Sequence, residues 1–234
     1  LQQVEPSKNK EQYVHLLVSL APHLPEAVYE VARVLEVEEQ RAEVLASLIP
    51  HLPEFQRDAA LEESWRLVEG GTKVWSWARV MAALAPQLPE VIYKTAETMR
   101  GDRSRVDVLA ALAPYLPELI YEDARALSVE VDRARVLAAL APHLPELVYE
   151  ETTGLKDERW RLEVWVALAE YFSTLPPLVL YLRWEGIVAD LTQLERSNAL
   201  DAIAKLTPVI KTLGGDAALS QTLHAVQTVA EWWP

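Results

Sequence analysis

Leu140-Ala141-Pro142-His143-Leu144-Pro145-Glu146 is the stretch from which the architecture follows, because it occurs five times in the chain with small changes. The other four copies end at Glu26, Glu54, Glu90 and Glu118. The first prolines of successive copies lie 28, 36, 28 and 28 residues apart, and Leu168-Ala169-Glu170-Tyr171 is a sixth, degenerate copy 28 residues further on. A fixed period of this length is typical of stacked repeat arrays.

The two prolines of each copy are placed to stop one helix and start another. The residue before a proline is displaced from the helical region, so the first helix is expected to end near Ala141. Pro145 suits the first position of the next helix, where its missing N–H costs no hydrogen bond. Glu146 follows in the first turn, where the helix dipole favours a negative charge. Such a short turn predicts antiparallel neighbouring helices.

The segments on the two sides of this turn have different apolar patterns. Before the turn, Val136, Leu137 and Leu140 stand among alanines, which indicates a helix buried on most sides. After the turn, apolar or small residues recur at i, i+4 and i+7, as in Ile92, Ala96 and Met99, in Ile120, Ala124 and Leu127, and in Val148, Thr152 and Leu155. This spacing predicts a one-sided helix, so the first arm is expected inside and the second outside.

These patterns predict an all-α fold, an α-solenoid of about six short antiparallel helical hairpins of 28 residues with a C-terminal helical cap. Each repeat of such an array contacts mainly its neighbours, and an atypical terminal unit closes it. The array is expected over 1–185 and the capping helices over 186–234. The repeats are expected at about 10–37, 38–73, 74–101, 102–129, 130–157 and 158–185.

Capping and breaking residues predict several helix ends. The second repeat is eight residues longer than the period, which predicts an outer helix to about Glu69 that Gly70-Gly71 stops. A helix is expected from Ser197 to about Leu213, bent or ended early by Pro208. Further caps are expected at Asp102, Asp132 and Asp157, a break at Gly214-Gly215, and a last cap at Asp216.

Composition narrows the classes of partner and the location. The net charge of −13 argues against nucleic acid, because that binding depends on Lys and Arg at phosphates. The absence of cysteine excludes a disulfide framework and a thiolate metal site. No apolar run approaches the roughly 20 residues that span a bilayer, and residues 1–6 lack a signal pattern. No membrane association and a cytoplasmic location are therefore expected.

The sequence contains no recognisable catalytic centre, so we predict that the protein is not an enzyme and holds no cofactor or metal. Gly70-Gly71-Thr72-Lys73 lacks the spacing of a phosphate-binding loop, and no His-Glu-x-x-His or Gly-x-Ser-x-Gly occurs. His23, His51 and His143 share one position of the turn. We interpret them as polar turn residues that bond a helix end rather than as metal ligands.

Three groups of residues are candidates for partner binding. Trp65, Trp75, Trp77 and Trp160 surround irregular repeats, where exposed rings would be interface hot spots and buried rings would fill gaps. Tyr93, Tyr121 and Tyr149 form a column that either lines a recognition surface or seals joints between outer helices. A ladder at the start of the inner helices is either a solvated salt-bridge network or an edge for an anionic ligand, and its members are Arg41, Arg105, Arg133 and Arg161.

The unit Arg-Ala-Xaa-Val-Leu-Ala-Xaa-Leu-Xaa-Pro-His-Leu-Pro-Glu stands at 41–54 and 133–146, and the chain ends in Leu213-Gly214-Gly215-Asp216 followed by 226–234. Together these segments resemble the C-terminal sensor arrays of bacterial NLR-like (STAND) ATPases, and the hairpins are similar to HEAT- and TPR-class repeats. The resemblance implies a non-catalytic array that binds a protein or peptide ligand and senses it, often in anti-phage defence. Ligand binding would then release the ATPase switch.

Two other functions remain open from the sequence. The array could be a structural, autoinhibitory or oligomerisation scaffold that packs on its own ATPase and effector domains or on another copy. An enzyme with a pocket at the irregular third joint is the third possibility. Exposure of Trp65, Trp75, Trp77 and the tyrosine column on one face would favour the first two, and a closed pocket with convergent carboxylates the third.

Overall fold

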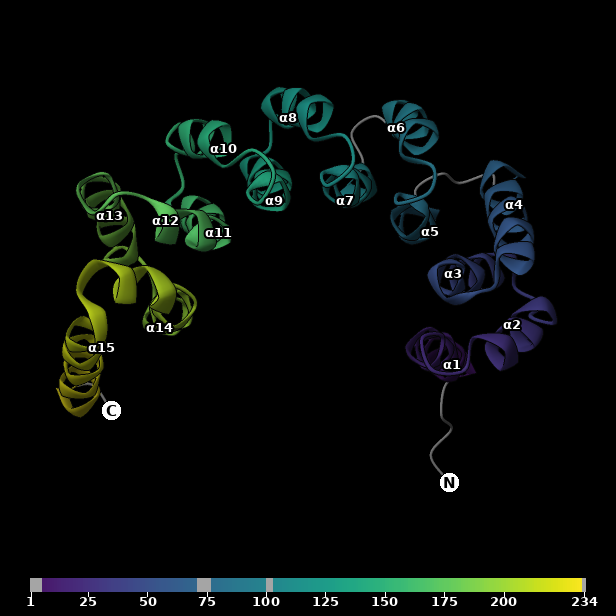
Figure 1. Cartoon of the computed structure of the whole chain (residues 1–234), viewed down its shortest axis with the longest axis horizontal. Coiled ribbons are helices and arrows are strands. Elements are labelled where there is room, and N and C mark those ends of the chain that lie inside the picture. The colour runs from purple at the N-terminus through teal and green to yellow at the C-terminus, as the bar shows by residue number, and fades with distance from the viewer. Residues whose placement is uncertain (1–5, 71–76, 100–102, 233–234) are drawn as a thin grey trace. The chain divides into compact units, whose positions relative to one another are not determined.

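The computed structural model describes residues 6–70, 77–99 and 103–232, and it shows helices joined by short connections (Figure 1). The predicted all-α class is confirmed, since these ranges contain no strand. The chain divides into two compact units, Leu1–Leu116 and Pro117–Pro234. No helix in the described ranges is long and apolar enough to cross a membrane.

In the unit Leu1–Leu116, helices from the first arms pack in succession. They are α1 (Pro6–Leu20), α3 (Glu38–Leu48), α5 (Ala78–Leu84) and α7 (Arg103–Leu112), and each contacts the next (Figure 1). The second arms are α2 (Pro25–Arg33), α4 (Glu54–Gly70) and α6 (Pro89–Thr98). Helix α2 packs against α3, α4 packs against both α3 and α5, and α6 packs against α7. A short 3-10 turn, Ile49–His51, connects α3 to α4.

The unit Pro117–Pro234 begins with the same alternation. The inner helices α9 (Glu130–Leu140) and α11 (Glu158–Ala167) pack on each other, and α8 (Pro117–Ala126), α10 (Pro145–Thr152) and α13 (Pro177–Leu191) cover them (Figure 1). The remaining helices are α12 (Ala169–Thr174), α14 (Arg196–Lys205) and α15 (Thr207–Trp232). Here α14 contacts α11, and α15 contacts α12, α13 and α14.

The repeated turn ends its helix by a different route from the one predicted. Ala141 stays in the right-handed helical region (φ −52°, ψ −41°) although Pro142 follows it. The backbone turns at Leu144 instead, with φ −132° and ψ 55°, and Leu24 and Leu88 adopt nearly the same angles. Each of these leucines precedes the second proline, so the steric restriction before proline acts there. The second proline occupies the first turn of the new helix, as predicted.

The inner and outer helices bury the residues that their patterns predict. Val136, Leu137 and Leu140 are fully buried in α9. On the outer helices the position seven residues after the second proline is always small and fully buried, as Ala32, Ala60, Ala96, Ala124 and Thr152 show. Thr152 satisfies its hydroxyl by donating to the carbonyl of Val148 at 2.5 Å. A small side chain at this position lets each outer helix approach the inner layer closely.

The predicted cap at Asp157 is confirmed, because its carboxylate accepts from the backbone N–H of Arg159 at 2.9 Å at the start of α11. α4 extends to Gly70, and Gly71 of the predicted stop lies outside the described residues. The chain also breaks at Gly214-Gly215, where Gly215 has φ +62° and ψ −156°, angles that an L side chain rarely adopts.

Two predicted caps are wrong. Asp132 and Ser197 lie inside α9 and α14, which begin after Val129 and Glu195. The expected early end before Pro208 is confirmed, since α14 stops at Lys205 and Pro208 lies in the first turn of α15, where its missing N–H is tolerated. Positions 185–186, where the capping helices were expected to begin, lie inside α13. Asp102 lies outside the described residues.

The column of small residues gives a test of close packing. We expect Ala124→Leu to lower the free energy of unfolding by about 1–3 kcal/mol, because three extra carbon atoms would enter a filled site. Ala126→Leu is the matched control, since Ala126 is exposed at the end of the same helix. Urea unfolding followed by circular dichroism measures both variants. Equal stability of the two variants would contradict close packing at Ala124.

Candidate functional site

Three arginines of the predicted ladder bind backbone carbonyls six residues earlier in the chain. Arg41 donates to the carbonyl of Leu35 at 3.3 Å, Arg133 to that of Leu127 through Nε and Nη2 at 3.1 and 2.8 Å, and Arg161 to that of Leu155 at 2.7 Å. These carbonyls lie just beyond the ends of α2, α8 and α10. Each guanidinium therefore satisfies an acceptor that the preceding helix leaves open.

Each of these arginines also pairs with a carboxylate of the outer helix that follows. Arg41 pairs with Glu63 at 3.3 Å, Arg133 with Glu151 at 3.8 Å, and Arg161 with Asp190 at 2.5 Å. We call this arrangement the arginine clamp: Arg41, Arg133 and Arg161, each joining a leucine carbonyl to a carboxylate. The three arginine side chains are only about a fifth exposed (21, 22 and 22%). These arginines do form salt bridges, as one of the two interpretations expected, but the pairs are largely buried rather than solvated.

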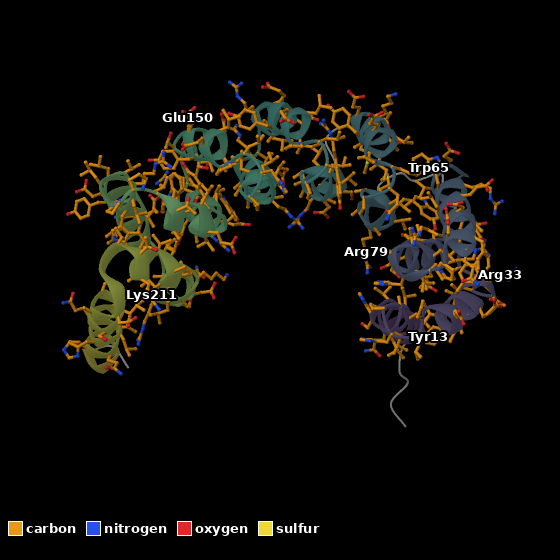
Figure 2. All side chains as sticks on the ribbon, in the orientation of Figure 1. Tyr13, Arg33, Trp65, Arg79, Glu150 and Lys211 are labelled. Carbon is orange, nitrogen blue, oxygen red and sulfur yellow. The ribbon has the colours of Figure 1, made fainter. Side chains whose placement is uncertain are left out.

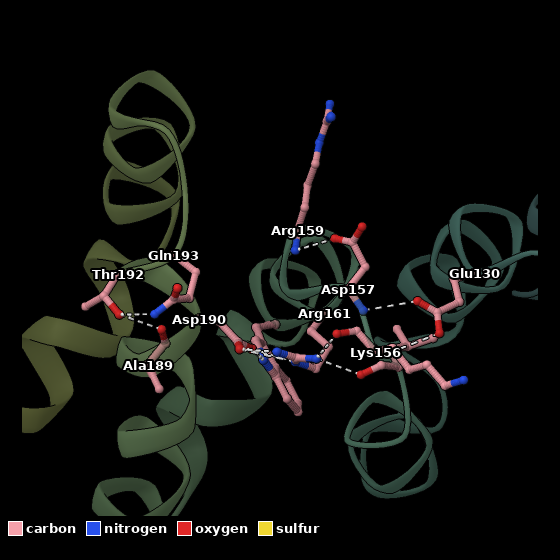
Figure 3. A network of polar contacts seen from close by, with 11 residues as sticks. Glu130, Lys156, Asp157, Arg159, Arg161, Ala189, Asp190, Thr192 and Gln193 are labelled. Carbon is pink, nitrogen blue, oxygen red and sulfur yellow. Dashed lines mark hydrogen bonds and ion pairs between the residues drawn. The ribbon is translucent and has the colours of Figure 1, made fainter.

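The clamp at Arg161 is the most extensive (Figure 3). Its guanidinium forks onto both oxygens of Asp190, and the indole N–H of Trp165 donates to the same carboxylate at 3.0 Å. Asp190 is 7% exposed and is one of three buried polar residues among those described. The bonds to Asp190 raise the pKa of Arg161 further above its ordinary value. The network ties α11 to α13.

Glu130 fixes the connection that leads into α11 (Figure 3). Its two carboxylate oxygens accept from the backbone N–H groups of Lys156 and Asp157 at 3.0 and 3.1 Å. These bonds favour the charged form and lower the pKa of Glu130 below its ordinary value. Because Asp157 in turn caps α11, Glu130 positions both the connection and the cap.

Tyr149 belongs to a packed aromatic cluster. Its ring centroid lies 5.2 Å from that of Trp165 and 6.1 Å from that of Phe172, and the Arg183 guanidinium lies over it at 4.0 Å. Arg183 pairs with Glu146 at 3.0 Å and donates a hydrogen bond to the hydroxyl oxygen of Tyr171 at 2.9 Å. Tyr171 itself donates to Glu146. The hydrogen bonds from Tyr171 and Arg183 lower the pKa of Glu146 below its ordinary value. The ring of Tyr149 fills the joint between helices.

The other described residues predicted for partner binding are buried or half-buried on their own helices. Trp77 is 6% exposed at the start of α5, so its ring is part of the core. Trp65 is half-buried on α4, and Trp160 is half-buried with the Arg159 guanidinium 4.9 Å from its ring centroid. Trp75 lies outside the described residues. Arg105 and Tyr93 are half-buried on α7 and α6.

Tyr121 is the predicted residue that lies in an open pocket. The pocket separates α8 from α10 and has a volume of about 540 Å³. We call it the α8–α10 groove, and its lining residues are Glu118, Tyr121, Glu122, Arg125, Leu147, Glu150 and Glu151. Glu150 projects from α10 (Figure 2), and Leu147 is 41% exposed. Leu119 is also exposed, at the position of α8 that Leu147 holds in α10.

The groove has a negative potential. Four carboxylates line it against one guanidinium, and Arg125 is shared between Glu151 at 3.4 Å and Glu122 at 3.7 Å. Burial and then the Glu151 charge raise the pKa of Tyr121, which keeps its hydroxyl a hydrogen-bond donor. The groove therefore offers an aromatic ring, an aliphatic side chain and excess negative charge. This combination fits a partner with cationic and apolar side chains.

The histidines of the turns and a smaller pocket lie apart from the α8–α10 groove. His23 and His143 are exposed, and it is their backbone N–H groups that close the turns on Leu20 and Leu140. A smaller pocket of about 170 Å³ lies among α1, α3 and α5, where Arg79 and Glu43 form an ion pair at 2.5 Å. It is smaller than the α8–α10 groove, and its one arginine is paired with Glu43.

A scan against protein-family models finds no match for the chain, and searches of curated proteins and of solved structures find none either.

The arginine clamp predicts a specific loss of stability. Arg133→Met keeps the aliphatic stem but leaves the Leu127 carbonyl without its donor, so the free energy of unfolding should fall by about 1–3 kcal/mol. Arg66→Met, at an exposed arginine of α4, is the control and should change it by less than about 0.5 kcal/mol. Urea unfolding at neutral pH compares them. A neutral Arg133→Met would show that the carbonyl contact does not stabilise the fold.

The lowered pKa of Glu130 predicts a dependence of stability on pH. A carboxyl whose pKa is lower in the folded state stabilises the fold above the unfolded value, here 4.5, and this stabilisation is lost as pH falls through the folded pKa. We therefore expect acidification below about pH 4.5 to destabilise the protein, and Glu130→Gln to reduce this loss. Urea midpoints between pH 7 and pH 3 measure it, with the exposed Glu62→Gln as control. An unchanged pH profile in Glu130→Gln would contradict the assigned bonds.

Proposed function

We propose that the chain is a non-catalytic recognition array that binds a protein or peptide segment. In this proposal about six hairpins stack into one α-solenoid, and the last helices cap it. The observation that carries the binding role is the α8–α10 groove, where Tyr121 and Leu147 stand among four carboxylates.

The ligand class follows from the chemistry of the groove. The carboxylates would attract lysine or arginine side chains, and Leu147 and Leu119 would contact aliphatic side chains between them. Because four of the lining residues are glutamates, like-charge repulsion excludes nucleic acid and acidic peptides. A basic segment with interspersed leucine or valine is the ligand that we propose.

The array would act as the ligand-sensing region of a cytoplasmic bacterial NLR-like (STAND) ATPase. The support is the repeated unit at 41–54 and 133–146 and the ending 213–216 with 226–234, as set out above. In such a protein, ligand binding at the outer helices would shift the equilibrium of the switch domain by its differential affinity for the two states. The ligand would come from an invading phage or from the host's response to it.

Peptide binding tests the groove directly. We expect a fluorescent peptide of alternating lysine and leucine to bind with a Kd on the order of micromolar, weakening as salt is added. Glu150→Lys and Leu147→Ser should each raise the Kd at least about ten-fold, which corresponds to about 1.4 kcal/mol. Fluorescence anisotropy measures binding, with a glutamate–leucine peptide as the negative ligand.

The matched controls carry the same chemical changes on another unit. Glu62→Lys reverses an exposed glutamate of α4, and Val34→Ser removes an aliphatic side chain that is 76% exposed. Both should bind the peptide as the unaltered chain does. Equal weakening by Glu62→Lys would show that net charge alone attracts the peptide and that the groove is not the site.

Retention of a partner from infected cells tests the sensing role. The immobilised chain should retain a phage-encoded or infection-induced protein that Leu147→Ser does not retain, while Val34→Ser does. Retention of the same proteins from infected and uninfected cells would count against sensing and favour a scaffold.

A further inference from the structure

Helix α13 presents an apolar face that the rest of its unit does not cover. Leu178, Tyr181 and Leu182 are 73, 57 and 64% exposed, although the helix packs on α11 and α15 through Leu180 and Ile187, which are buried. Successive positions 178, 182, 185 and 189 share one stripe of the helix. Val179 and Val188 flank the stripe, and both are exposed.

Gly186 lies in the middle of this helix, although the packing of the described chain does not require a glycine there. Glycine is the weakest helix former after proline, so an interior glycine usually marks a close approach. A Cβ built on Gly186 meets nothing within 4 Å, so no part of the described chain approaches it. Gly186 and the exposed Ala189 form a notch next to the bulky Leu182.

The charges near the stripe favour an apolar partner. Glu185 is the charged residue on the stripe itself. Arg183, two residues earlier, points to the other side, where it pairs with Glu146 and covers Tyr149. The stripe therefore lacks the charge density that a basic or acidic segment would need, in contrast to the α8–α10 groove.

We propose that this face of α13 binds the same face of a second copy of the chain, with the two helices antiparallel. Leu178, Tyr181 and Leu182 form a bulky half, and in the other half Gly186 and Ala189 leave a notch beside Glu185 and Val188. A two-fold axis places the bulky half of each copy against the hollow half of the other, which is the self-complementarity that an isologous dimer requires.

The area of the face agrees with a weak, specific dimer. With about 150–250 Å² for a large side chain, the exposed fractions on α13 amount to on the order of 500 Å² per copy. Two copies would then bury about 1,000 Å², which is the lower range for a specific interface. This pairing is independent of ligand binding at the α8–α10 groove, so either can fail without the other.

Sedimentation of the unaltered chain and two variants tests the dimer. We expect the chain to dimerise with a Kd on the order of 10–100 μM, and Leu182→Glu to raise this Kd at least about ten-fold. Leu223→Glu is the matched control, because Leu223 is 59% exposed on α15 and away from the stripe. Its Kd should equal that of the unaltered chain. A monomer at all concentrations up to about 0.5 mM, or equal weakening by Leu223→Glu, would overturn the proposal.

The variant Gly186→Ala distinguishes an effect on dimerisation from an effect on the stability of the fold. Measured at a concentration where the chain is monomeric, its Tm should rise by about 2–4 °C, because alanine is the better helix former and no atom stands in its way. Its dimerisation should nevertheless weaken, since the methyl group fills the notch that receives Leu182. A higher Tm with unchanged or tighter dimerisation would show that no partner approaches α13 at Gly186, and would overturn the pairing.

Discussion

The contact on which the described repeats depend is the one between an arginine at the start of an inner helix and the carbonyl of a leucine six residues earlier. Arg41, Arg133 and Arg161 each make it, and each also reaches a carboxylate of the next outer helix. One guanidinium therefore joins three consecutive segments of the chain. Since its donors are fixed in a plane, it sets the angle at which those segments meet, and a lysine could not do so.

Proline turns and small residues complete what the clamp begins. The turn at Leu144 reverses the chain within a few residues, and the same backbone angles recur at Leu24 and Leu88. The returning helix then packs closely on the inner layer because the side chains of Ala32, Ala96 and Ala124 at the contact are small. Within one repeat, the arginine contact, the proline turn and the small buried residue therefore act at successive points of the chain. This is why these features recur in the sequence.

The period, the all-α class and the buried positions were predictable because they are local properties of a short window. The apolar spacing at Ile92 and Ala96 or at Ile120 and Ala124 identifies the buried face without knowledge of the neighbours. Asp157 was predictable as a cap for the same reason. The predicted caps at Asp132 and Ser197 failed because the helices begin earlier, and a favourable residue inside the first turn competes with one before it.

The largely buried ion pairs between helices join residues far apart in sequence, and this is why the sequence did not predict them. Asp190 lies 29 residues after Arg161, and Arg183 lies 37 after Glu146, with no periodic signal to connect them. The same pairing separates structural from available charge: Glu146 and Asp190 are engaged by arginines, whereas Glu118 and Glu150 stand exposed beside Leu147. A carboxylate that already accepts hydrogen bonds from two donors has fewer acceptor positions free for a partner. The exposed glutamates therefore mark the surface where new contacts can form, and the bare stripe of α13 marks another, for which burial rather than charge is the driving force.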